Sequence, residues 1–313
     1  MNLSRLSQGN RSASNPTSLV WIIVAGLAII VGGILIATLT PILLPPQASA
    51  ESQQIDNLFR FMLAIGGSVF LLVQGMLVYS IVRFRARENE RADGPPIHGN
   101  ATLELVWTLI PTIIVALIAI YAFVVYTDIT SVKPNEQQVG AVGARYAWTF
   151  NYTFSRADLP VDLDFTTLPE NIQADLTDAD GTVRFSHPQL HTWVGQPVDV
   201  AMNATDVNHA FWIPAMRVKQ DLLVGRTTNV RFTPIEAGVY RVVCAELCGA
   251  GHGNMAGTIA PDGTLQGAWL VVHPDRETFL SEFFNEQVSR IINPPDDPVL
   301  LGRQILDSGA YPC

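Results

Sequence analysis

Residues 244–255 read "CAELCGAGHGNM" and crowd four side chains with soft or borderline donor atoms into one glycine-rich loop. The four are Cys244, Cys248, His252 and Met255. Thiolates and thioethers select copper(I), zinc or iron–sulfur clusters, and imidazole suits zinc or copper. A further imidazole stands upstream in "DVNHAFWIP", where we expect His209 to lie between two strands. These residue types at these spacings predict a transition-metal site.

Several kinds of site could use this set. A zinc site could take the two cysteines and two histidines, but structural zinc has no need of Met255. A disulfide between Cys244 and Cys248 is an alternative outside the cell. A single copper ion would need only one of the two thiolates. A second thiolate four residues away could instead bridge two metal ions, and Met255 and the backbone carbonyl of Glu246 would then supply one weak ligand each.

Three long apolar runs precede this region and predict membrane-spanning helices: Leu19–Leu44, Phe61–Val82 and Leu105–Tyr126. Each run reaches the ~20 residues that a helix needs to cross the hydrocarbon core, and none contains a charged residue. The composition agrees, because 48% of the residues are hydrophobic and only 15% are charged. We therefore expect the first part of the chain to lie in lipid.

Arginines predict the orientation of these helices. The loop "RFRARENER" (83–91) is rich in arginine, whereas no basic residue precedes Arg60 in the segment between the first two runs. The positive-inside rule therefore places residues 83–103 in the cytoplasm and the chain after residue 128 outside. The "ASA" at 48–50 resembles a signal-peptide cleavage site. Residues 1–50 are then either a signal peptide or a first transmembrane helix, and we expect cleavage.

The exported part reads as short strands separated by turn residues. "ARYAWTFNYTF" (144–154) alternates aromatic with mostly polar residues, so we expect one half-buried strand over its whole length. The spacing of the strands favours an antiparallel sandwich or small barrel. "DRETFLSEFFNEQVSRII" after His273 predicts a helix. The remaining histidines show no paired ligand spacing, and we expect them on the surface or in loops: His98, His187, His191 and His273.

The loop "CAELCGAGHGNM" resembles the Cys-x-Glu-x-Cys-Gly-x-x-His-x-x-Met signature of subunit II of the haem–copper cytochrome c oxidases, which binds the dinuclear copper-A centre. "DVNHAFWIPAMRVKQD" and "HGNATLELVWTLIP" (98–111) also resemble segments of that family. The resemblance spans residues 55–275 and implies that the outer domain is cupredoxin-like.

The expected fold class is thus a membrane-anchored α+β protein with four parts. These are a signal peptide or first transmembrane helix (1–50), a transmembrane helix hairpin (51–128), a cupredoxin-like copper-A domain that is an antiparallel β-sandwich or barrel (129–275), and a helical or irregular C-terminal tail (276–313).

The resemblance also implies roles for individual residues. The copper ligands would be His209, Cys244, Glu246 through its carbonyl, Cys248, His252 and Met255. The side chain of Glu246 would point to a magnesium ion at the boundary with subunit I, since a buried carboxylate beside two thiolates needs a cation. Glu104 matches a glutamate near the mouth of a proton pathway, although a carboxylate in interfacial water fits equally well. Asp206 matches a position for docking cytochrome c, with an ordinary turn residue as the alternative.

Two departures from the family pattern are visible. Tyr146 stands where the family often has the tryptophan that receives the electron, and Trp148 matches the second tryptophan; both could equally be core residues of their strand. The tail "GRQILDSGAYPC" (302–313) resembles the opening of a c-type cytochrome domain but carries no CxxCH motif. We expect no haem in this chain and a free thiol at Cys313.

The function that these features predict is an electron-accepting subunit of a cytochrome c oxidase in a bacterial-type energy-transducing membrane. Cytochrome c or a similar carrier would deliver electrons on the outer (periplasmic or lumenal) face, and haem in subunit I would receive them for reduction of oxygen to water in a proton-translocating complex. Alternatives are the copper-A subunit of a nitric-oxide reductase and a membrane-tethered copper carrier. A quinol oxidase subunit would lack the two thiols. The net charge of −9 argues against a nucleic-acid partner.

Overall fold

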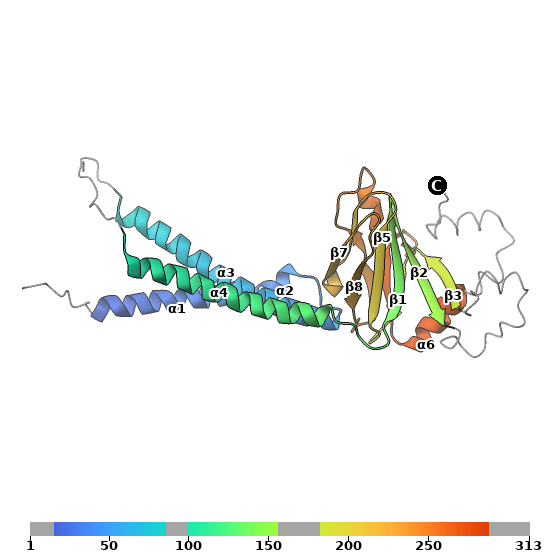
Figure 1. Ribbon diagram of the computed structural model, residues 1–313, viewed down its shortest axis with the longest axis horizontal. Helices are drawn as coiled ribbons and strands as arrows, with labels where there is room; N and C mark the ends of the chain where they lie inside the picture. The colour runs from blue at the N-terminus through green and yellow to red at the C-terminus, as the bar shows by residue number, and fades with distance from the viewer. Residues whose placement is uncertain (1–15, 86–98, 156–181, 288–313) are drawn as a thin grey trace, which may run out of the picture. The chain divides into compact units, whose positions relative to one another are not determined.

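The computed structural model describes residues 16–85, 99–155 and 182–287. Figure 1 shows long helices in the first part of the chain and strands in the second. The chain divides into two compact units. One consists of residues 1–44 and 56–120, and the other of residues 45–55 and 121–313.

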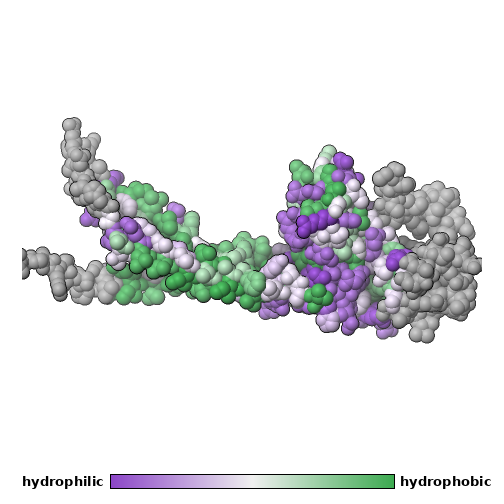
Figure 2. Space-filling model, in the orientation of Figure 1, coloured by the Kyte–Doolittle hydropathy of each residue, from purple (hydrophilic) through white to green (hydrophobic). Residues whose placement is uncertain are grey.

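The helical unit confirms the three predicted apolar runs. Its long helices are α1 (Pro16–Thr38), α3 (Ala50–Arg83) and α4 (Ala101–Ile129), with the short α2 (Thr40–Leu43) after α1. Each of the three is long and apolar enough to cross a membrane. Figure 2 shows that apolar side chains cover much of their surface, as a lipid environment requires. The arginine-rich loop beyond residue 85 lies outside the described residues.

The β unit is built mainly from three sheets. The largest has the order β3 (Thr182–His187), β2 (Ala147–Ser155), β1 (Gln137–Ala144), β5 (Val198–Ala204) and β8 (Thr228–Phe232). The second has the order β10 (Val243–Cys244), β6 (His209–Ile213) and β7 (Val218–Leu222). The third has the order β4 (Leu190–Trp193), β13 (Trp269–His273) and β9 (Gly238–Arg241). A small pair joins β11 (Thr258–Ile259) to β12 (Leu265–Gln266).

Most of these strands pair antiparallel, as predicted. Two pairs are parallel, β1 with β5 and β4 with β13. The sheets enclose one core of buried residues whose largest members are aromatic, including Trp148, Phe150, Tyr152 and Phe211. The fold is therefore a cupredoxin-like β-sandwich with a mixed rather than purely antiparallel sheet.

The single strand predicted over residues 144–154 is wrong at its start. β1 ends at Ala144 and β2 begins at Ala147, and these two residues pair with each other. Arg145 and Tyr146 therefore form the two-residue turn of a hairpin. The alternation is confirmed beyond the turn, where Trp148 and alternate residues after it are buried. The sequence of β1 is rich in glycine and alanine and has only two of the β-branched residues that usually mark a strand, Val139 and Val142.

The helix predicted after His273 is confirmed within the described part of the chain. A short α6 (Arg276–Thr278) continues into the wider helical turn η5 (Phe279–Phe284). Phe279, Phe283 and Phe284 of this segment are buried in the core of the β unit. The rest of the predicted tail, including Cys313, lies outside the described residues.

Candidate metal centre

Two neighbouring strands and one loop position the predicted ligands. His209 is the first residue of β6, and Cys244 is the last residue of β10, which pairs with β6. The expectation that His209 lies between strands is therefore wrong. A glycine-rich loop then carries Cys248, and the short helix η4 (His252–Met255) supplies the last two ligands. The strand pair β6–β10 thus positions His209 and Cys244, and the loop with η4 brings Cys248, His252 and Met255 to them.

The described side chains form two groups, each around one sulfur atom. Cys244 Sγ lies 3.8 Å from His209 Nδ1 and 3.2 Å from the carbonyl oxygen of Glu246. Cys248 Sγ lies 3.5 Å from His252 Nδ1 and 3.4 Å from Met255 Sδ. Each group thus contains a sulfur, an imidazole nitrogen and a weaker donor.

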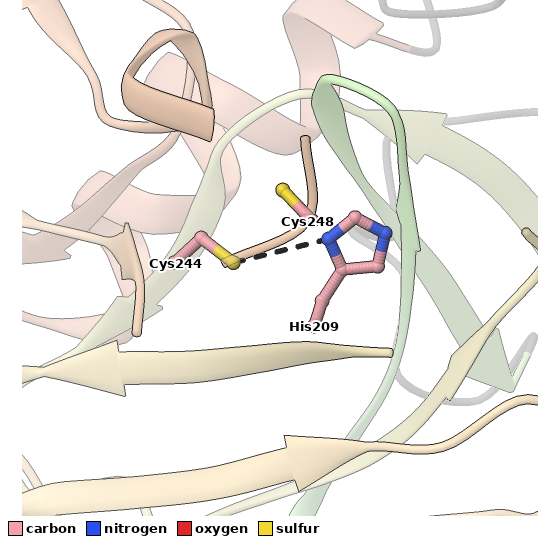
Figure 3. Close-up of side chains that lie close together, drawn as sticks. All are labelled: His209, Cys244 and Cys248. Carbon is pink, nitrogen blue, oxygen red and sulfur yellow. Dashed lines mark hydrogen bonds between the residues drawn. The ribbon is translucent and has the colours of Figure 1, made fainter. Parts of the chain in front are cut away.

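The two groups also meet each other. Ligand atoms of His209, Cys244 and Cys248 all lie within 4.8 Å of one another, and Figure 3 shows the three side chains close together, with the sulfur of Cys244 directed toward the His209 ring. The three are buried, as is Met255 at 1% exposure, whereas His252 is half-buried. Neither cysteine is in a disulfide. The disulfide alternative is therefore not the state that the structure shows.

Burial affects the acidity of the Cys248 thiol. Burial and the neighbouring Cys244 raise the pKa of the Cys248 thiol to about 11. Thiols bind transition metals as thiolates, so a metal ion that occupies this site displaces the protons.

Asp206 holds the ring of His209. Its Oδ1 lies 3.0 Å from His209 Nε2, the nitrogen that faces away from the sulfurs. Although burial raises the pKa of this carboxyl, hydrogen bonds from His209, the Val207 N–H and Arg145 lower it below its usual value. The Arg145 guanidinium lies 3.1 Å from the other carboxylate oxygen. A carboxylate on the second nitrogen fixes both the tautomer and the orientation of a ligand histidine.

Both aromatic residues suggested for electron transfer contact the ligand region. Tyr146 lies in the β1–β2 turn, and its ring is packed so closely on the loop that a β-carbon at Gly251 would collide with it. Trp148 is buried, and its indole N–H donates to the carbonyl of Met255 at 3.0 Å. Its ring centroid lies 6.1 Å from that of His209. Both aromatic rings therefore lie against the segments that carry the ligands.

Two predicted residues are less closely involved. The side chain of Glu246 is exposed in this chain, and its expected place at the boundary with subunit I stays a prediction. Only its carbonyl approaches the sulfur of Cys244. Glu104 lies exposed in the first turn of α4, in the helical unit.

The sequence misplaced two of the histidines. His187 ends β3, His191 lies in β4 and His273 ends β13, so all three are strand residues. His191 and His273 are buried, with 3.1 Å between Nδ1 of the first and Nε2 of the second. Phe283 stacks on the ring of His191 at a centroid distance of 3.7 Å. The expectation of surface or loop positions is therefore wrong for His191 and His273, whereas the half-buried His187 is still partly at the surface. His98 lies outside the described residues.

The donor set fits copper. Two buried thiols, two imidazoles and a thioether are the soft and borderline ligands that copper prefers. The division into two groups, each with its own sulfur, matches the six-ligand set that the sequence resemblance implies.

Comparisons with known proteins agree with this geometry. Residues 37–125 match the family described as cytochrome c oxidase subunit II, transmembrane domain, and residues 137–261 match its periplasmic domain. The chain is 36% identical over 232 residues to cytochrome c oxidase subunit 2 of Synechocystis sp., covering 68% of this chain and 70% of that protein. It is 32% identical over 292 residues to cytochrome c oxidase subunit 2 of Thermostichus vulcanus, covering 85% of each.

These matches cover α3, most of α4 and most of the β unit, and they place the β unit on the outer side of the membrane. The chain belongs to the cytochrome c oxidase subunit II family.

Proposed function

We propose that the six donors on β6, β10 and the following loop hold a dinuclear copper centre through which electrons pass into the oxidase. As a member of its family, the chain is a subunit of an oxidoreductase complex that also contains subunit I. The proposed ligands are His209, Cys244, Glu246 through its carbonyl, Cys248, His252 and Met255. When bound, the copper pair supplies a one-electron carrier whose charge change is shared between two ions.

The observation that carries this proposal is the division of the ligands into two groups. A single copper or zinc ion needs one set of three or four donors. Here each sulfur has its own imidazole nitrogen and its own weak donor, Glu246 O for Cys244 and Met255 Sδ for Cys248. In a mononuclear site, one of these two groups of donors would bind no metal ion.

The chain's own residues would prepare the site for electron transfer. Asp206 keeps the His209 ring turned toward the sulfurs, and Trp148 holds the Met255 carbonyl. Ligands fixed in this way move little when the charge of a bound metal changes. Tyr146, packed on the loop, would be the aromatic contact for an electron donor, which we propose to be cytochrome c or a similar cationic protein.

Two carboxylates outside the copper ligands have proposed roles, one in magnesium binding and one in proton uptake. The exposed carboxylate of Glu246 is available to a cation between this chain and subunit I, and magnesium prefers such oxygen ligands. Glu104, exposed in the first turn of α4, is the proposed carboxylate at a proton pathway. Removal of either carboxylate tests its role without touching the copper ligands.

The test of the copper proposal uses the full chain purified in detergent and loaded with copper. Metal content per chain is measured together with the electron paramagnetic resonance spectrum. We expect two copper ions per chain and hyperfine structure from one unpaired electron shared by two nuclei. Cys244→Ser should abolish this signal.

Cys313→Ser is the matched control, because it removes a thiol that lies outside the ligand motif. It should keep both the copper content and the spectrum. One copper ion with a blue-copper spectrum, or binding of zinc in preference to copper, would contradict the proposal.

A further inference from the structure

We propose that the chain is not cleaved after Ala50 and that α1 remains in the mature protein as a third transmembrane helix. This departs from the expectation of a cleaved leader that the "ASA" at 48–50 suggests. One set of contacts in each of the two units supports the proposal.

The first set joins residues 45–52 to the β unit through the backbone. The Ala48 N–H donates to the Ala215 carbonyl at 3.0 Å, and the Ala48 carbonyl accepts from the Ile235 N–H at 2.9 Å. Ala48 is fully buried. The segment 45–52, here called the strap, is thus held between two loops of the β unit that come much later in the chain.

Side chains of the strap extend this contact. The Ser49 hydroxyl donates to the Met216 carbonyl at 2.8 Å, and Ser49 is fully buried. The carboxylate of Glu51 accepts from the Thr233 N–H at 2.9 Å and from the Thr233 hydroxyl at 3.1 Å. Glu51 is only 4% exposed, which is rare for a carboxylate without partners. The strap is therefore an integral part of the folded β unit.

Cleavage after Ala50 would remove half of this contact. A signal peptidase acts during export, so burial in the final fold would not protect the site. Cleavage would instead affect the hydrogen bonds of the folded β unit. Loss of Ala48 and Ser49 would leave the Ala215 and Met216 carbonyls and the Ile235 N–H without their present partners. Buried backbone groups are almost always paired in native proteins, so the fold fits a chain that keeps these residues.

The second set of contacts joins α1 to α3 inside the helical unit. Gly33 and Ala37 are buried and lie four residues apart, which places them on one face of α1. A β-carbon at Gly33 would lie 2.5 Å from the Ala64 carbonyl oxygen and 2.8 Å from the Ser68 nitrogen, both in α3. The backbones therefore approach so closely at this point that only glycine fits.

This close approach distinguishes a packed helix from a leader. The apolar core of a signal peptide needs only hydrophobicity over a short length. Helices that associate within a membrane use small residues at their crossing point. A β-carbon at the neighbouring Gly32 would also lie 2.6 Å from the Leu71 side chain of α3, whereas Gly26, further toward the N-terminus, has open space around its α-carbon.

The deciding experiment is the intact mass and N-terminal sequence of the full chain, isolated from the membrane in its assembled oxidase. We expect a chain that begins at Met1 or Asn2. An N-terminus at Glu51 would overturn the proposal. Neither result depends on the copper centre, so failure here leaves the proposed function untouched.

Ala50→Leu gives an independent check, because Ala50 is exposed and a larger side chain there would block a peptidase that requires a small residue. We expect the variant to differ from the parent chain only by the mass of the substitution. A variant about 50 residues longer than its parent would show that the parent is cleaved.

Gly33→Leu and Gly26→Leu test whether α1 acts in the mature protein. Gly33→Leu should lower the thermal unfolding temperature of the purified oxidase, whereas Gly26→Leu should leave it unchanged. If α1 were removed after export, the two variants would yield identical mature proteins. Equal unfolding temperatures for both variants and the parent would therefore contradict the proposal.

Discussion

Single side chains beside the proposed ligands determine how firmly the ligands are held. Asp206 is the clearest case, because its carboxylate contacts the nitrogen of His209 that does not face the sulfurs. Asp206→Asn keeps the size of the side chain and removes its charge. We expect the affinity for copper to fall roughly 10–100-fold, the usual effect of losing a partner of a ligand histidine. Equilibrium competition with a copper chelator measures it.

Asp262→Asn is the matched control for this prediction. Asp262 is exposed in the turn between β11 and β12 and contacts Thr264 of the same turn. The Asp262→Asn substitution should leave the affinity for copper unchanged. An equal loss in both variants would mean that Asp206 acts through overall charge rather than through His209.

Tyr146 provides a second prediction for a single residue. Its ring packs on the loop that carries Cys248 and His252, so Tyr146→Leu should slow electron transfer from reduced cytochrome c while copper content stays the same. Tyr146→Trp should restore much of the rate, because it returns an aromatic surface. Stopped-flow kinetics measures both. A normal rate in Tyr146→Leu would exclude Tyr146 from the electron path.

The sequence predicted the proposed ligands better than it predicted their surroundings. Cys244, Cys248, His252 and Met255 are close in the sequence, so spacing alone indicates one site. Hydrogen bonds between distant segments carry no such local pattern. The contact of Trp148 with the Met255 carbonyl spans 107 residues and depends on how β2 packs against η4.

Strand pairing brings together groups that the sequence separates, and the histidines of β3, β4 and β13 are the main example. Burial, together with the neighbouring His187 and His273, lowers the pKa of His191 well below 6.5. Burial also lowers the pKa of His273, although Glu282 opposes the shift. The folded protein therefore binds these protons less readily than the unfolded chain.

This difference predicts the sign of the pH dependence of stability. Well above pH 6.5 both histidines are neutral in the folded and in the unfolded state, so they add no pH dependence to the stability there. As the pH falls below 6.5, the unfolded chain takes up protons that the folded state resists, and stability is lost. Denaturant unfolding of the full chain between about pH 8 and pH 5 measures the effect.

His191→Asn tests the assignment of this effect. The variant should reduce the slope of stability against pH below 6.5, whatever its stability at pH 8. An unchanged slope would place the pH dependence elsewhere in the protein.

The elements themselves were predicted where bulky residues alternate and were missed where they do not. The aromatic residues of β2 gave a clear period of two, whereas β1 with its glycines gave none, and the hairpin turn between them was read as strand. The apolar membrane helices needed no pattern beyond length and composition.

For the whole molecule, net charge is the property that affects how fast an electron donor associates. The chain carries a net charge of −9, and acidic surfaces attract cationic proteins over distances that salt shortens. If the donor is cationic, its bimolecular rate should fall at least tenfold between about 0.01 M and 0.5 M salt. The rate with an uncharged artificial donor should stay constant. A donor rate that does not depend on salt would contradict steering.

The sequence could not predict how the chain divides into its two compact units. The sequence predicts a helix hairpin over residues 51–128 and a β domain from residue 129, and nothing in it indicates that residues 45–55 group with the strands, as they do in the structure. Nothing near residue 48 in the sequence indicates partners that lie more than 160 residues later. The folded protein alone reveals that contact.

The strap has a consequence for how the protein is made. Glu51 bonds with Thr233, 182 residues further along the chain, so the β unit cannot be completed until almost all of the protein has been synthesised. Residues 45–52 must then be on the same side of the membrane as the β unit. If only one of the helices α3 and α4 crossed the membrane, the strap and the β unit would lie on opposite sides and the β unit could not close. Completion of the β unit therefore requires that both helices cross.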